Sequence, residues 1–126
     1  MTQSKVRAQR ILKYGSGWYQ VSVPELTAGA WTIYSLADLS PEAPKYEPLD
    51  YLEITNTDTA SPVRVVLDHA DSFSVPASAI RTLEHAPYRT VQVHNEGSST
   101  IAAGKVTLLA RRAPISVDKY IREFRL

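Results

Sequence analysis

The chain of 126 residues contains no cysteine, and it has no run of about 18 consecutive apolar residues. The first absence excludes disulfides and thiolate metal sites, and the second excludes a membrane-spanning helix of ordinary length. Its first residues also lack the apolar stretch of a signal peptide, so we expect no secretory export. A single domain is the expectation for this length, and a hydrophobic content of 44% is enough to build a core.

Short segments with period-two alternation of apolar and polar residues dominate the chain, and this pattern marks strands with one buried face. We expect strands at 18–23, 30–36, 50–56, 63–67, 73–75, 88–95 and 105–109, with 80–83 as either a strand or a helical turn. The predicted core residues are Leu52, Ile54, Val63, Val65, Leu67, Val91, Val93, Val106 and Leu108. The pattern predicts an all-β fold, a β-sandwich or jelly-roll-like single domain of about eight strands.

A weak internal repeat links the two central pairs of strands. Asn56 and Asn95 each end an apolar strand and begin a polar turn, 39 residues apart. One interpretation is that the same β-hairpin is used twice, and the other is that any two hairpins resemble each other. In the second turn, Gly97 is free to take a positive φ.

Three prolines, Pro41, Pro44 and Pro48, fall between the second and third predicted strands. Proline disrupts both the interior of a helix and the ladder of a central strand. We therefore expect residues 38–49 to form an extended loop that crosses from one side of the domain to the other.

Charge is distributed unevenly although the net charge is only +1. Residues 1–24 carry +4, residues 105–126 carry +4, and the body between them carries −7. Basic ends on an acidic body indicate that the ends meet an acidic partner. The acidic body repels phosphate, so we expect no nucleic-acid binding.

These features divide the chain into three parts: a basic arm with a Gly-Ser-Gly hinge (1–17), a β-sandwich domain (18–112), and a C-terminal arm (113–126). The last part has apolar residues at helical spacing, which predicts a short amphipathic helix that docks on its own sheet or on a neighbouring subunit. Its apolar face is too small for us to expect membrane binding. The predicted interface residues are Lys5, Arg7, Arg10, Lys13, Val117, Tyr120, Ile121, Phe124, Arg122 and Arg125.

Candidate catalytic and metal-binding residues are few. His69 and Asp71 share a face if they lie on a strand, and His85 or His94 could complete a two-histidine, one-carboxylate iron site. The simpler interpretation makes His69 and Asp71 polar turn residues. Neither a nucleophile elbow nor a phosphate-binding loop is present. We therefore expect a non-enzymatic protein without metal or cofactor.

Aromatic residues gather early in the chain. Trp18, Trp31 and Tyr34 could form a platform on which sugar rings stack, as in carbohydrate- or receptor-binding β-sandwich modules. The alternative is that Trp31 belongs to the core with Tyr19, and that other tyrosines surround it.

The strand ends Ile-x-Asn and Val-x-Asn, the segment Phe-x-Val-Pro-Ala at 73–77 and the arms at both ends give the chain a family likeness. Over about 50–111 it resembles the minor structural proteins of tailed bacteriophages, of the capsid cement or decoration type. This resemblance implies a homo-oligomer, with a trimer favoured, that is made in the host cytoplasm. It also implies a place on the capsid exterior of the virion, where the arms bind the major capsid protein or another virion protein. Tail or fibre modules that bind carbohydrates or receptors are the alternative.

Overall fold

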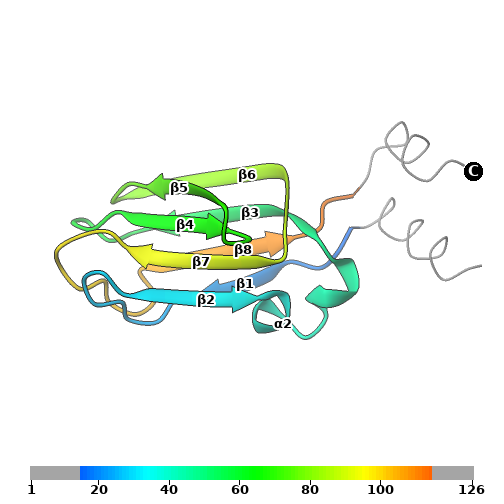
Figure 1. Cartoon of the computed structure of the whole chain (residues 1–126), viewed down its shortest axis with the longest axis horizontal. Coiled ribbons are helices and arrows are strands. Elements are labelled where there is room, and N and C mark those ends of the chain that lie inside the picture. Colours follow the sequence, from blue (N-terminus) through cyan, green and yellow to red (C-terminus); the bar gives the residue numbers. More distant parts are fainter. Residues whose placement is uncertain (1–14, 115–126) are drawn as a thin grey trace, which may run out of the picture.

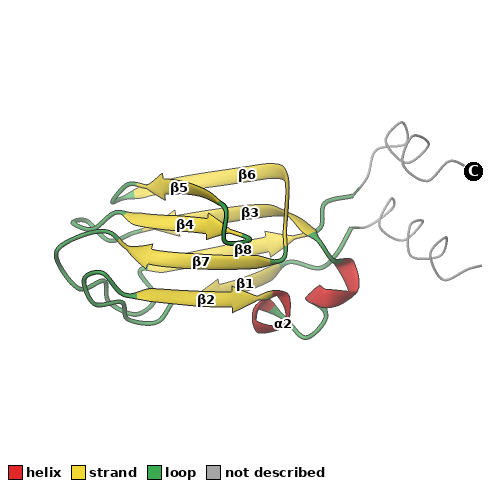
Figure 2. Ribbon diagram, viewed as in Figure 1, coloured by secondary structure: helices red, strands yellow, loops and turns green. Residues whose placement is uncertain are grey.

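The computed structural model describes residues 15–114. Within this range the chain forms two antiparallel sheets of four strands each and two short helical segments (Figure 2). The strands are β1 (Tyr19–Ser22), β2 (Trp31–Ser35), β3 (Leu49–Asn56), β4 (Val63–Leu67), β5 (Asp71–Val75), β6 (Ala79–Tyr88), β7 (Thr90–Asn95) and β8 (Val106–Arg111). The helical segments are α2 (Leu36–Leu39) and the 3-10 helix η1 (Ala43–Tyr46).

The strand order identifies the fold. One sheet has the order β1-β8-β3-β6 and the other has the order β2-β7-β4-β5 (Figure 1). The first strand therefore pairs with the last, the second with the seventh, the third with the sixth and the fourth with the fifth. A long antiparallel ribbon wrapped into two sheets in this way is a jelly roll. The prediction of an all-β, jelly-roll-like sandwich is confirmed.

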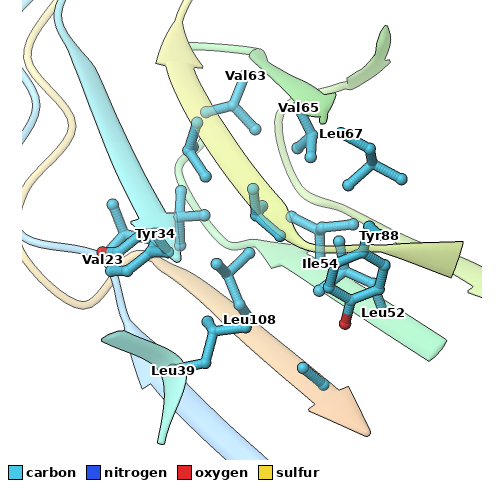
Figure 3. Packing of buried hydrophobic residues seen from close by; sticks show 14 of the residues in the cluster. Val23, Tyr34, Leu39, Leu52, Ile54, Val63, Val65, Leu67, Tyr88 and Leu108 are labelled. Carbon is cyan, nitrogen blue, oxygen red and sulfur yellow. The ribbon is translucent and has the colours of Figure 1, made fainter. Parts of the chain in front are cut away.

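The core lies between the two sheets (Figure 3). All nine predicted core residues are buried, from Leu52 on β3 to Leu108 on β8. Tyr88 is the largest fully buried side chain, and its hydroxyl donates to the Tyr51 carbonyl at 2.7 Å. Burial raises the pKa of Tyr88, so the phenol stays neutral across the pH range in which proteins are stable.

The two segments that begin at Asn56 and Asn95 are not hairpins, and that prediction is wrong. The chain passes from one sheet to the other between β3 and β4, and again between β7 and β8. Only β4 and β5 are consecutive strands within one sheet. Alternation along a strand reports which side chains are buried, but it does not say which strand is the neighbour.

Asn56 and Asn95 nevertheless have the same role in the fold. Both are buried at a corner of the sandwich, and the side-chain amide of each lies against three backbone carbonyls. The side-chain oxygen of each accepts the backbone N–H two residues later, from Asp58 and from Gly97. The repeat seen in the sequence is therefore a pair of equivalent corners.

The strand alternative for 80–83 is confirmed, because this segment is part of the ten-residue strand β6, which continues to Tyr88. Residues 38–49 do cross from one sheet to the other, but the prediction that they form only an extended loop is wrong. They contain the end of α2 and all of η1, and Leu49 begins β3. Ser35 caps α2 together with Asp38, and Pro44 occupies the first turn of η1, where a missing N–H costs nothing.

Candidate functional site

The two described ends of the chain lie side by side at one end of the sandwich (Figure 1). The backbone N–H of Ser16 donates to the Arg112 carbonyl at 2.8 Å, and the Arg112 N–H donates to Ser16 Oγ at 2.6 Å. Gly15 has a φ of +67°, and a Cβ there would lie 2.5 Å from the Arg112 carbonyl oxygen. These contacts hold the Gly-Ser-Gly segment against β8, where the sequence suggested a free hinge.

Arg112 is anchored within this junction. Its Nη1 donates to the Pro48 carbonyl at 2.9 Å, and its Nε lies 3.8 Å from Asp50 Oδ2. Both side chains of this ion pair are largely buried. The other oxygen of Asp50 accepts the Ala113 N–H at 2.8 Å. Arg112 therefore stabilises the end of β8, and its charge is not available to a distant partner.

A shallow pocket of about 290 Å³ lies beside the junction. Trp18 forms one wall, with the guanidinium of Arg111 4.3 Å from its ring centroid and the ring of Tyr51 5.5 Å away, edge-on. Glu84 and His85 on β6 complete the lining together with Asp50 and Ala113. Trp18 is 55% exposed, so an aromatic face flanked by polar groups is open to solvent next to both ends of the chain.

The three basic residues of the C-terminal part that the structure describes, Lys105, Arg111 and Arg112, do not form one patch. Arg111 stacks on Trp18 and Arg112 is held at Asp50. Lys105 lies at the opposite end of the sandwich, between β7 and β8, where its carbonyl accepts from Thr57. The remaining predicted interface residues lie outside the described residues: Lys5, Arg7, Arg10, Lys13, Val117, Tyr120, Ile121, Phe124, Arg122 and Arg125.

The proposed aromatic platform of Trp18, Trp31 and Tyr34 does not exist, and that prediction is wrong. Trp18 packs on the sheet that contains β1, whereas Trp31 lies on β2 in the other sheet. Tyr34 is buried, and burial raises the pKa of its hydroxyl. The alternative that placed Trp31 and Tyr19 in the core is correct for Tyr19, which is buried. It is wrong for Trp31, which is 48% exposed and stacks its ring on His94 at 4.0 Å.

The candidate metal ligands lie on different elements, with His69 in a turn, Asp71 on β5, His85 on β6 and His94 on β7. His69 lies in the turn between β4 and β5 and contacts Gln92, while His94 stacks on Trp31. The neighbouring Asp68 accepts the backbone N–H groups of Arg89 and Thr90 and so fixes the β6–β7 connection. Among residues 15–114 there is no group of three or more His, Asp or Glu side chains that could hold a metal ion.

Sequence reasoning missed the junction formed by Ser16, Asp50 and Arg112. A small polar residue after glycine and a charge at the start of a strand are common, and no local pattern joins positions 96 residues apart. In the described part of the chain, no helix has the length and apolarity needed to span a membrane.

The geometry defines this protein as a jelly-roll β-sandwich in which the two ends of the described range meet at one end of the sandwich. No family model matches the chain, and no curated protein matches it in sequence. A family two carbohydrate esterase from Cellvibrio japonicus is similar over 79% of the chain, with 14% identity and a TM-score of 0.39. The chain spans only about a third (36%) of that esterase. The Tobacco streak virus coat protein is similar over 84% of the chain and 92% of its own length, with 9% identity and a TM-score of 0.38.

Proposed function

We propose that this chain is a non-enzymatic structural protein of a virion, of the capsid cement or decoration type. In this role it forms a homo-oligomer and binds the coat lattice on the capsid exterior through its terminal segments. One observation carries the proposal: the two ends leave the sandwich at one point, held together by Ser16 and Arg112.

Joined ends matter because they act on one partner surface. The first 24 residues carry +4, and both terminal segments begin within hydrogen-bonding distance of each other. When two weak contacts share an anchor, the second forms at a high effective concentration, so avidity exceeds either affinity alone. A jelly roll supports this use, because viral capsid subunits are among the proteins built on it. That support is an analogy at the level of fold.

Oligomeric state tests the proposal directly. We expect light scattering with multi-angle detection to give a threefold lower mass after removal of residues 115–126, through loss of the trimeric contact, because the apolar residues at helical spacing in this segment need a partner surface. Circular dichroism should still report a folded β-sandwich in the shortened chain. A monomeric mass for both forms, at every concentration tested, contradicts assembly through this segment.

A carbohydrate-binding function is the second candidate, and the pocket at Trp18 is the observation that favours it. An exposed indole beside the carboxylate of Glu84 offers both a stacking surface and a hydrogen-bond acceptor to a sugar. On this hypothesis, Trp18→Ala removes retardation in polysaccharide-containing native gels, whereas Trp31→Ala on the opposite sheet leaves it unchanged. Equal mobility of all three forms, with and without polysaccharide, contradicts this candidate.

A further inference from the structure

The sandwich has four edge strands, and three of them carry features that prevent pairing with another chain. The strand β1 has only four residues, with Pro24 soon after it. The strand β6 carries charged residues and Pro87, and its register with β3 is irregular. On β5, the carbonyl of Ser74 is covered by the guanidinium of Arg81.

The fourth edge strand, β2, has none of these features. Its five residues, Trp31–Ser35, include no charge, no proline and no glycine, and their register with β7 is continuous. Trp31 and Ile33 point outward and are 48% and 56% exposed. Figure 1 shows β2 at the margin of its sheet. An uncharged, regular edge with exposed apolar side chains is a template for strand pairing.

The hydrogen-bonding pattern between β2 and β7 identifies the backbone groups of β2 that face away from β7. Asn95 donates its N–H to the Ala30 carbonyl at 3.0 Å, and hydrogen-bonded positions alternate along an antiparallel pair. Thr32 and Tyr34 therefore bond to β7, while the amides of Trp31 and Ile33 face outward. At Ser35 the outward N–H is already bonded to Asp38 Oδ2 at 2.9 Å. The pairing edge is thus limited to the start and middle of the strand.

We propose that two copies of this chain pair through β2, antiparallel across a two-fold axis at Ile33. The two four-stranded sheets then join into one continuous sheet. In this register Ile33 faces the same residue of the second copy, and the two exchange backbone hydrogen bonds. Trp31 lies opposite Ser35, whose N–H stays bonded to Asp38. Both exposed apolar side chains of each copy gain cover, which an isologous contact achieves with a single strand.

Charge favours a second copy over a different partner strand. A charged strand would find no counter-charge on β2, and it would lose hydration on pairing. The sequence of β2 is itself uncharged and rich in β-branched and aromatic residues, so a second copy of β2 is a suitable partner strand for it. This pairing does not depend on the terminal segments or on the virion role proposed above.

Ile33 makes the pairing testable because the residue faces itself. Ile33→Lys places two like charges directly opposite each other, as does Ile33→Glu, so each variant of the full chain is expected to show half the native mass by light scattering. An equimolar mixture of the two variants is expected to restore the native mass, because lysine then faces glutamate. Halving is the expected result whether or not the terminal segments add a further level of assembly.

Ile80 supplies the matched control, since it is another isoleucine on an edge strand and is 65% exposed. Ile80→Lys should leave the mass unchanged. Native mass in either Ile33 variant overturns the proposal, and so does a mixture that stays at half mass, which places Ile33 in a contact with a different surface. A monomeric native chain at the highest soluble concentration also overturns it.

Discussion

Replacing Asn95 with aspartate is expected to destabilise the sandwich by about 3–5 kcal/mol at neutral pH, the cost of a buried charge left without a partner. The Asn95 amide nitrogen lies 3.0 Å from the Leu26 carbonyl, 3.2 Å from that of Thr27 and 2.9 Å from that of Ser99. The residue is fully buried. Aspartate keeps the shape, but it puts an oxygen where three carbonyl oxygens need a donor. Urea unfolding followed by fluorescence measures the loss.

The effect should depend on pH with a defined sign. Burial and facing carbonyls raise the pKa of the introduced carboxyl above its value in the unfolded chain, about 4. The folded variant then binds more protons than the unfolded one. The loss of stability is therefore complete when the pH lies above the pKa of the introduced carboxyl in the folded state. It shrinks as the pH falls towards the unfolded value, because the protonated carboxyl can again donate. A deficit that stays constant from pH 7 to pH 4 contradicts this account.

Two comparisons separate the buried corner from a general effect of added charge. Gln20→Glu makes the same chemical change at an exposed position on β1 and should cost well under 1 kcal/mol. Asn56→Asp should reproduce the large effect, because its amide faces the carbonyls of Ser61, Val75 and Pro76 at 3.0–3.4 Å. Since these two are the only asparagines in the chain, the pair also tests whether the repeated corners are energetically equivalent.

The buried faces of the strands could be predicted from the sequence because side-chain alternation is local. The segment 63–67 coincides with β4, and the alternating residues of β3 and β8 are buried as predicted. Strand partners could not be predicted, because Asn56 and Asn95 look the same at a hairpin turn and at a corner between sheets. The hydrogen bonds that distinguish these cases come from residues such as Leu26, far away in the chain.

The candidate site was harder to predict than the core for a related reason. Trp31 and Tyr34 lie on the same strand, but their side chains point to opposite faces of the sheet. Which of these two faces is buried depends on where the second sheet packs. The anchoring of Arg112 by Asp50 depends on the final order of the strands. Net charge by segment therefore overestimated the charge that the described C-terminal residues offer to a partner.

Gly97 should be almost as sensitive as Asn95, for a steric reason. The freedom to take a positive φ is not used at Gly97, since the described glycines with positive φ are Gly15, Gly29 and Gly104. A Cβ at Gly97 would instead lie 2.2 Å from Ser61 Oγ and 2.8 Å from Ser61 Cα. Because Ser61 is fully buried and part of the clash is with backbone, Gly97→Ala is expected to cost about 3 kcal/mol.

Gly104 provides the opposite case, with a φ of +82° and open space around the position of a Cβ. Gly104→Ala should cost only about 1–2 kcal/mol of backbone strain, and Gly104→Asn less, because asparagine tolerates this conformation. Ser61→Gly combined with Gly97→Ala should be more stable than the sum of the two single effects predicts, since the first change removes the two closest clashing atoms. Strictly additive free energies of unfolding in this pair would place the cost of Gly97→Ala somewhere other than Ser61. The contrast follows from geometry: at Gly104 the backbone conformation favours glycine, whereas at Gly97 the adjacent corner leaves no room for a side chain.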